Sequence, residues 1–150
     1  MITPEQLAIK VVAQMYDNDP FSKWLGIERI NVAPGVCVLQ MTVRYEMLNG
    51  FKIAHGGITY ALADSCLAFA SNSYGIQAVS VETSISHTKP VEEGDRLSAV
   101  ATEKSRTSRI AIYHINVTDQ NNTLVALFKG TAYRTGKLWF PEDQPEPITR

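Results

Sequence analysis

The segment from Ile53 to Val81 constrains the fold most, because it carries a single side chain that is charged at pH 7, the carboxylate of Asp64. The residues that follow His55-Gly56-Gly57 are rich in alanine and are apolar on nearly every face of a helix. A helix of this composition is buried on most of its sides. The sequence therefore predicts a central helix over residues 56–73, with the rest of the chain packed around it.

Asp64 lies in the third turn of this predicted helix, which is too far from the helix end for a capping role. Burial of an unpaired carboxylate is costly, and no Lys or Arg stands nearby on the helix to offset the cost. A subunit interface or a catalytic group would explain the carboxylate. The alternative is a structural carboxylate that accepts hydrogen bonds from Asn49 or from the backbone.

Composition limits the classes of protein to which the chain can belong. A length of 150 residues predicts one domain over residues 1–150, and 45% hydrophobic with 19% charged residues is typical of a globular protein. The net charge of -1 favours neither nucleic acid nor an anionic membrane as a partner. The sequence shows no basic-then-apolar leader and no apolar run of membrane-spanning length, so we expect a cytoplasmic protein.

The sequence contains none of the short motifs that mark several large enzyme classes. It has no G-x-S-x-G, H-E-x-x-H, G-x-x-x-x-G-K or G-x-G-x-x-G, which argues against serine hydrolases, zinc proteases, P-loop enzymes and simple dinucleotide binders. Cys37 and Cys66 form no C-x-x-C pair, so we expect both to be buried as small hydrophobic residues. We expect neither a metal site nor a cofactor.

The order of predicted elements indicates an α+β fold. Thr3-Pro4-Glu5-Gln6 is typical of a helix start, and it predicts a helix over about residues 4–16. A short helical turn over 21–25 ends at Gly26, and the residues from 31 to 35 favour a turn. The tail over 141–150 is expected to be loosely ordered. Patterns of β-branched and alternating residues predict strands over 36–44, 78–87, 96–104, 110–118 and 123–134.

Three features converge at the start of the central helix: Asn49-Gly50, then His55-Gly56-Gly57, then Asp64. This stretch resembles the hotdog-fold acyl-CoA thioesterases of the phenylacetate-degradation (PaaI-like) type. These proteins have an Asn six residues before a His-Gly-Gly, and nine residues separate that His from an Asp on the central helix. The similarity continues through Lys89-Pro90 to the strand that ends near Thr131, and it covers the chain from about residue 25 to 134.

The resemblance implies an antiparallel sheet of five or six strands wrapped around the central helix. It also implies a homodimer as the minimal unit and a homotetramer as the expected assembly, with acyl-CoA as the substrate and coenzyme A present only as part of that substrate. By position, it assigns Gly56 to carbonyl polarisation through its N–H, Asp64 to nucleophile or general base, Asn49 to orientation of water or substrate, and His55 to support of the carbonyl. In that family the Asp faces the other groups across the dimer interface.

Elementary chemistry supports the assignment of Gly56 independently. A helix N-terminus presents unpaired N–H groups and the positive end of the helix dipole, and two glycines let an acyl carbonyl approach closely. Since a thiolate is a good leaving group, one carboxylate can suffice for thioester hydrolysis. The sequence does not decide whether Asp64 attacks directly or activates water.

Several other residues are weaker candidates for substrate binding. Gly57 neighbours the proposed carbonyl site, and Ser80 matches a hydroxyl that some relatives use, although a Ser on a strand is usually plain surface. His55 has the alternative of capping the helix, Asn49-Gly50 is also a common turn pair, and His87 and His114 are expected to face solvent or a subunit boundary. The candidates for contacts with the phosphates of coenzyme A are Lys89, Arg106, Arg109 and Lys129.

The sequence thus predicts a cytoplasmic acyl-CoA thioesterase that acts without a metal or a cofactor. Two alternatives stay open. A hotdog dehydratase or hydratase would use His55 and Asp64 for proton transfer at a β-carbon, although the glycine pair fits carbonyl polarisation better. An acyl-CoA-binding module that senses its ligand would have no need of the buried charge of Asp64. The sequence leaves the acyl group open between aryl and fatty acyl chains.

Overall fold

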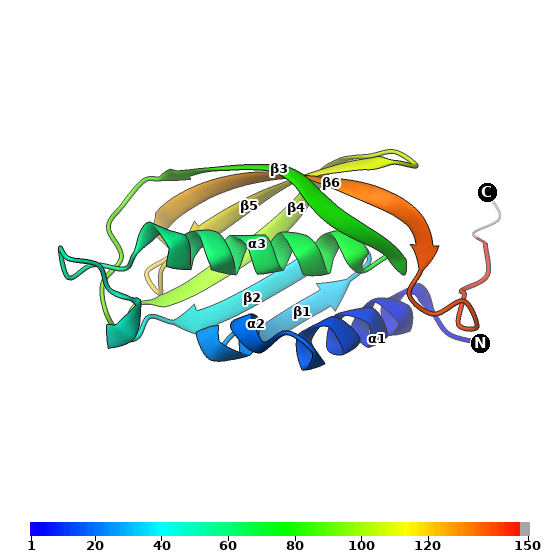
Figure 1. The fold of residues 1–150 in the computed structure, drawn as a ribbon, viewed down its shortest axis with the longest axis horizontal. Helices are drawn as coiled ribbons and strands as arrows, with labels where there is room; N and C mark the ends of the chain where they lie inside the picture. Colours follow the sequence, from blue (N-terminus) through cyan, green and yellow to red (C-terminus); the bar gives the residue numbers. More distant parts are fainter. Residues whose placement is uncertain (148–150) are drawn as a thin grey trace.

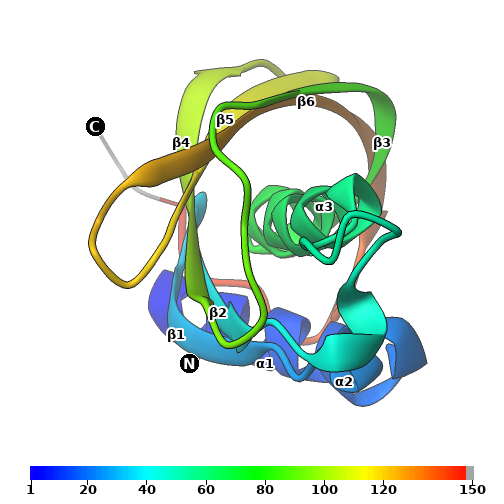
Figure 2. The ribbon, with the colours of Figure 1, turned by 90° about the vertical axis from the view of Figure 1, so that its left-hand side faces the viewer.

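The protein folds as one antiparallel sheet of six strands that curls around a long helix (Figures 1 and 2). The structure is a computed structural model, and it describes residues 1–147. The sheet order is β1-β2-β4-β5-β6-β3, and helix α3 (Gly56–Asn72) lies in the concave face. The strands are β1 (Glu28–Ala33), β2 (Val36–Thr42), β3 (Ile76–His87), β4 (Arg96–Arg106), β5 (Ile110–Thr118) and β6 (Leu124–Leu138). The predicted α+β arrangement, a sheet wrapped around a central helix, is confirmed.

Helix α3 packs against the sheet along its whole length because nearly every face of it is apolar. Leu62 and Cys66 are fully buried, and Leu67 is 1% exposed. The strands pack against the helix with every second side chain, because successive side chains of a strand point to opposite faces of the sheet. Strand β5 buries Ala111, Tyr113, Ile115 and Val117, while its other residues point outward. At Gly130 of β6 the sheet lies so close to the helix that a side chain there would collide with Leu67.

The N-terminal segment covers the outer strands. Helix α1 (Pro4–Asp17) begins at the predicted start with a capping box, in which the Thr3 hydroxyl accepts from the Gln6 N–H and the Gln6 side chain accepts from the Thr3 N–H. Helix α2 (Pro20–Leu25) ends at Gly26, which has a φ of 73°. Figure 1 shows both helices beneath β1 and β2.

The sequence prediction was wrong for the region before β2. A turn was expected over residues 31–35, but β1 extends to Ala33 and pairs with β2, and the turn is confined to Pro34-Gly35. The reason is that β1 is an edge strand whose first four residues are exposed, and its register shifts between Arg29 and Asn31. Such a strand has no hydrophobic alternation by which a pattern could identify it.

Past Leu138, the described residues form no helix or strand. They are held against α1 nevertheless, because Asp143 forms an ion pair with Lys10, whose ammonium also lies 4.0 Å from the centre of the Phe140 ring. Residues 148–150 of the tail predicted to be loose lie outside the described part. Within residues 1–147, no helix is long and apolar enough to cross a membrane.

Candidate active site

The first turn of α3 presents the backbone N–H of Gly56 to its surroundings, and no residue from 1 to 147 accepts from it. His55 caps the helix, because its Nδ1 accepts from the Gly57 N–H at 2.9 Å and its carbonyl accepts from the Ile58 N–H at 2.9 Å. The Gly56 N–H, between them in sequence, has no acceptor among residues 1–147. Because the positive end of the helix dipole adds to this donor, Gly56 can stabilise an oxygen that becomes negatively charged.

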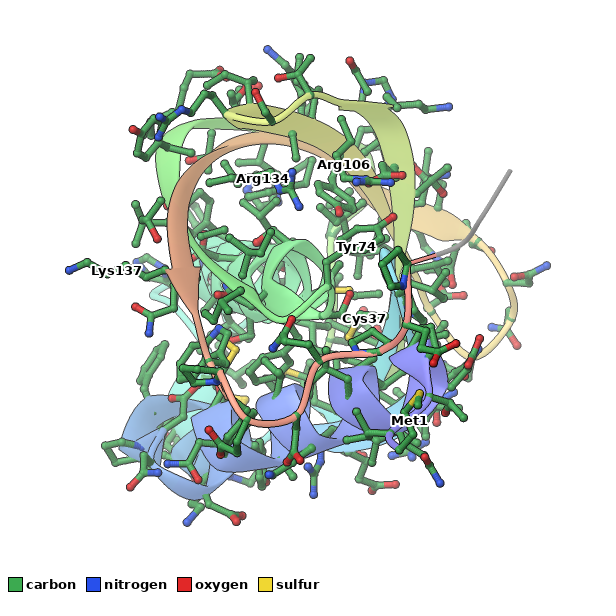
Figure 3. The ribbon with its side chains drawn as sticks, turned by 90° about the vertical axis from the view of Figure 1, so that its right-hand side faces the viewer. Met1, Cys37, Tyr74, Arg106, Arg134 and Lys137 are labelled. Atoms are coloured by element: carbon green, nitrogen blue, oxygen red, sulfur yellow. The ribbon has the colours of Figure 1, made fainter. Side chains whose placement is uncertain are left out.

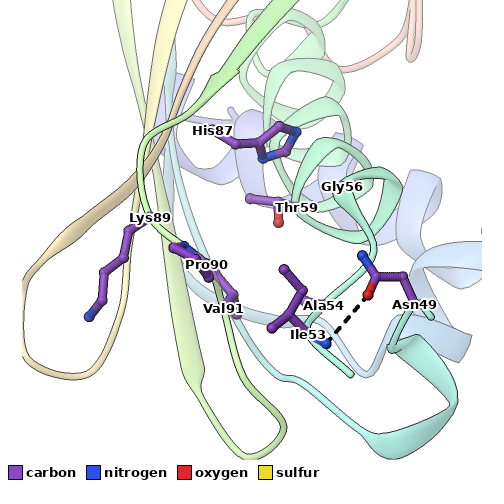
Figure 4. A pocket seen from close by; sticks show the side chains of 9 residues that line it. All are labelled: Asn49, Ile53, Ala54, Gly56, Thr59, His87, Lys89, Pro90 and Val91. Carbon is purple, nitrogen blue, oxygen red and sulfur yellow. Dashed lines mark hydrogen bonds between the residues drawn. The ribbon is translucent and has the colours of Figure 1, made fainter. Parts of the chain in front are cut away.

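A cavity of about 310 Å³ adjoins Gly56 and extends to the loop that precedes the helix (Figure 4). Asn49 lines it, and its Oδ1 accepts from the N–H of Phe51 at 2.9 Å and from the N–H of Ile53 at 3.4 Å. These bonds fix the loop and orient the side chain, so that the Asn49 Nδ2 remains a donor without a partner in the described chain. The cavity is lined by Asn49, Ile53, Ala54, Gly56, Thr59, His87, Lys89, Pro90 and Val91.

His87 is part of this cavity, which the sequence did not indicate. It is exposed, as expected, but a Cβ placed on Gly56 would lie 3.1 Å from the His87 Nε2. Figure 4 shows the ring above Thr59 and beside the helix start. His87 is 31 residues from Gly56 in sequence, and only the path of β3 across α3 brings the two together.

His55 stands on the other side of the helix start from this cavity. Its ring and Gly57 line a separate hollow with the stacked aromatic rings of Phe21 and Trp24. The Gly57 N–H is occupied by the His55 Nδ1. The structure therefore does not bring His55 or Gly57 into the cavity that Gly56 and Asn49 share, and the carbonyl and substrate contacts expected of them stay predictions.

Asp64 lines a second cavity of about 260 Å³ further along the helix, and Ser80 of β3 lines it as well. The Asp64 carboxylate is half-buried, and within residues 1–147 it accepts no hydrogen bond. The alternative role of Asp64, as a carboxylate bonded to Asn49 or to backbone, is not supported by these contacts. Burial raises the pKa of Asp64, because removal of water disfavours the charged form.

One chain does not bring the two halves of the expected site together. Asp64 follows Gly56 by eight residues on the same helix, which separates them by about 12 Å along the axis at 1.5 Å per residue. No single carbonyl can contact the Gly56 N–H while the Asp64 carboxylate of the same chain attacks its carbon. The structure thus groups Asn49 with Gly56, and Asp64 with Ser80, in two separate places.

The basic residues proposed for coenzyme A have partners within the chain. The Lys89 ammonium pairs with Asp119 at 3.0 Å and points away from the cavity in Figure 4, while Lys129 pairs with Glu82 at 3.1 Å. The Asp119 carboxylate is held by the backbone N–H of Thr123 and by Lys89, and both contacts lower its pKa.

Two other basic candidates lie at the opposite end of α3. Figure 3 shows Arg106 beside Tyr74, where its guanidinium pairs with Glu103 at 3.1 Å and lies 4.1 Å from the centre of the Tyr74 ring. Arg109, in the turn after β4, donates to the Tyr133 hydroxyl at 3.3 Å. The structure brings neither arginine to the Gly56 cavity of its own chain.

The remaining reactive groups serve packing. Cys37 and Cys66 are free and buried, as predicted, and the Cys66 Sγ donates to the Cys37 carbonyl at 3.3 Å. Burial raises the pKa of the Cys66 thiol, which keeps it unreactive. The described residues contain no group of three or more His, Cys, Asp or Glu that could hold a metal ion.

Comparison with known proteins connects this geometry to a family. The family model of the thioesterase superfamily matches residues 51–126. The acyl-coenzyme A thioesterase PaaI of Escherichia coli is 39% identical over 122 residues, which cover 81% of this chain and 87% of that protein. The structure of E. coli PaaI, from the phenylacetic acid degradation operon, superposes with a TM-score of 0.88 at 36% identity, over 91% of this chain and 99% of that one.

Two further solved structures have the same fold. The TT0310 protein from Thermus thermophilus matches with a TM-score of 0.75 at 41% identity, over 77% of this chain and 97% of that one. A Streptococcus mutans protein, solved bound to acetyl CoA, matches with a TM-score of 0.72 at 27% identity, over 75% and 90% of the chains. The chain therefore belongs to the hotdog-fold thioesterase superfamily, in its PaaI-like branch, and is an enzyme of the thioester-hydrolase class.

Proposed function

We propose that this enzyme hydrolyses acyl-CoA, and that two chains build each active site. The observation that carries the proposal is the pair of unpartnered groups on α3. Among residues 1–147, the Gly56 N–H at the helix start has no acceptor, and the Asp64 carboxylate about 12 Å further along accepts no hydrogen bond. The first suits a developing oxyanion and the second suits a nucleophile or base. A second copy of the chain supplies the missing half of each site.

Strand β3 offers the surface on which the second copy would bind. It is an edge of the sheet, twelve residues long, and its Val79 and Val81 side chains are 57% and 60% exposed. An exposed, apolar edge strand is a template for pairing with another strand. Two β3 strands paired about a two-fold axis place the two α3 helices antiparallel, so that Gly56 of one chain approaches Asp64 of the other. We propose this homodimer as the minimal unit, and a pair of dimers as the tetramer.

In the proposed reaction, the thioester oxygen accepts a hydrogen bond from the Gly56 N–H, and Asn49 Nδ2 orients the substrate or the water. Asp64 of the second chain either attacks the carbonyl carbon, which gives an anhydride that water then hydrolyses, or removes a proton from the attacking water. In both routes a C–O bond forms, the C–S bond breaks, and one proton from water ends on the leaving thiolate. The raised pKa of Asp64 makes its carboxylate a stronger base than an ordinary aspartate.

The choice of acyl-CoA as substrate rests on the leaving group and on the relatives. A thiolate can leave without a general acid to protonate it, so the proposed site needs no such residue. A metal or cofactor has no part in the proposed steps. The E. coli relative is an acyl-coenzyme A thioesterase, and the S. mutans relative was solved with acetyl CoA. The location we propose is the cytoplasm, where two free cysteines such as Cys37 and Cys66 stay reduced.

The test is release of thiol from a panel of aryl- and straight-chain acyl-CoA esters, measured on the wild type and on Asp64→Asn. We expect wild-type turnover and a fall in kcat of at least ~10²-fold in the variant, with acyl-CoA still bound. Asp17→Asn, at an exposed acid on α1, is the matched control and should keep full activity. The proposed function would be contradicted if the wild type hydrolysed none of the acyl-CoA esters. Tight binding of an ester without hydrolysis would indicate a sensing module instead.

A further inference from the structure

His87 stands against the backbone that is proposed to polarise the substrate carbonyl. It is the last residue of β3, and the Nε2 edge of its ring points at Gly56. A Cβ on Gly56 would lie 3.1 Å from Nε2, 3.5 Å from Cε1 and 3.8 Å from Cδ2. Only the absence of a side chain at Gly56 lets the ring come this close.

The direction of the approach matters more than the distance. Each Cα–Cβ bond in a helix tilts toward the helix N-terminus, and the unpaired N–H groups of the first turn point the same way. A group that occupies the Cβ direction of Gly56 therefore flanks the space in front of the Gly56 N–H. The His87 ring makes no hydrogen bond with any described residue, so its nitrogens are free to contact a substrate there.

Asn49 Nδ2 also lines this cavity without a partner in residues 1–147, whereas the other polar groups nearby, those of His55 and Lys89, are already used. The His55 Nδ1 accepts from the Gly57 N–H, which occupies both that histidine nitrogen and the second glycine N–H. The Lys89 ammonium pairs with Asp119 outside the cavity. His87 is the imidazole that lines the cavity of Gly56, whereas His55 lines the hollow on the other side of the helix start.

We infer that His87 is a catalytic residue of the thioester hydrolysis, which donates a hydrogen bond from Nε2 to the same carbonyl oxygen that accepts from the Gly56 N–H. The inference rests on the proposed function of this site. As the C–O bond forms at the carbonyl carbon, the electron pair of the C=O bond moves to oxygen, and both donors stabilise that charge. When the pair returns and the C–S bond breaks, Nε2 still carries its proton, so the step needs no further reactant.

The experiment compares His87→Phe and His87→Gln with the wild type. Phe fills the volume of the ring without a donor, whereas the Gln side-chain amide places an N–H near the position of Nε2. Removal of one oxyanion donor costs about 10²–10³ in kcat, so we expect a loss of this size in His87→Phe with a KM within about threefold of the wild type. His87→Gln should keep at least about tenfold more activity than His87→Phe. His114→Phe, at an exposed histidine of β5, is the matched control and should keep full activity.

A second measurement observes the carbonyl directly. An acyl-CoA analogue in which CH2 replaces the thioester sulfur has a ketone that cannot be hydrolysed, and hydrogen bonds lower its infrared C=O frequency. We expect a lower frequency on the wild type than on His87→Phe, with His87→Gln between them. A histidine that only shapes the cavity would leave the frequency unchanged.

Several outcomes would overturn the inference. Wild-type kcat in His87→Phe, alongside an inactive Asp64→Asn, would remove His87 from the mechanism and leave the proposed function standing. A change in KM and in preferred acyl length without a loss of kcat would make His87 a wall of the cavity and no donor. A wild type that neither hydrolyses acyl-CoA nor binds the ketone would overturn the inference together with the proposed function.

Discussion

Gly130→Ala tests how tightly the sheet must approach α3 for the site to form. Gly130 is a buried residue of β6, and a Cβ there would lie 2.4 Å from Leu67 Cδ2, 3.0 Å from Leu67 Cδ1 and 3.1 Å from Phe128 Cε1. Since carbon atoms pack best at about 3.5–4.0 Å, the shortest of these contacts falls more than 1 Å short. Leu67 is 1% exposed, so the Leu67 side chain must shift toward the cavity that it lines, or the helix or the strand must move, to relieve the contact.

Overpacking of this kind costs about 1–3 kcal/mol, which lowers the Tm of a chain of this size by roughly 2–12 °C. Thermal unfolding followed by circular dichroism measures the shift, and Gly50→Ala is the control, because no atom of residues 1–147 lies within 4 Å of a Cβ at Gly50. Leu67 also lines the Asp64 cavity, so thiol release should fall together with stability. A Gly130→Ala variant with the Tm and the activity of the wild type would refute the close packing described above.

Two further predictions concern charge and capping. Because burial raises the pKa of Asp64, the acid limb of kcat against pH should lie above the ordinary aspartate value of 3.8. A raised pKa of Asp64 in the folded state also means that the free energy of unfolding falls as pH rises above 3.8. Asp64→Asn should therefore stabilise the protein at neutral pH and lose this advantage in acid. Denaturant unfolding of the wild type and the variant at several pH values measures the difference. Thr3→Ala removes the hydroxyl of the α1 capping box and should cost about 1 kcal/mol, or roughly 2–4 °C in Tm, whereas an unchanged Tm would show that the cap contributes nothing.

Local patterns were enough to predict the central helix and most strands. The helix was expected over 56–73 and runs over Gly56–Asn72, because His55-Gly56-Gly57 marks its start and an apolar run marks its length. β5 was placed over 110–118, and the structure has the same bounds, since its buried and outward residues alternate. β1 could not be found, because its first residues are exposed and its place depends on pairing with β2 and on packing against α1, which no local pattern shows.

The candidate site divides in the same way. The spacing of three residues close in sequence could predict that Asn49 lies in the loop before the helix, Gly56 at the helix start and Asp64 in the helix itself. His87 could not be predicted, because it reaches Gly56 only through the path of β3 over the helix. The partner of Lys89 is 30 residues away, and no local pattern indicates that its charge is already paired.

The central claim, that each active site takes Gly56 from one chain and Asp64 from another, has a direct test in mixed dimers. Gly56→Val fills the space beside His87 Nε2, and Asp64→Asn removes the carboxylate, so each variant alone should be inactive. Co-expression with two different tags isolates the dimer that contains one chain of each. One of its two sites then keeps both groups, and thiol release should return to about half of the wild-type value.

The reciprocal dimer, a wild-type chain with a chain that carries both substitutions, decides the matter. Both of its sites lose one group if the chains share the sites, so it should be inactive. If each chain instead held a complete site, this dimer would keep about half of the wild-type activity and the first mixed dimer would have none. Thiol release from these two purified dimers, side by side, is the measurement that supports or contradicts the shared active site.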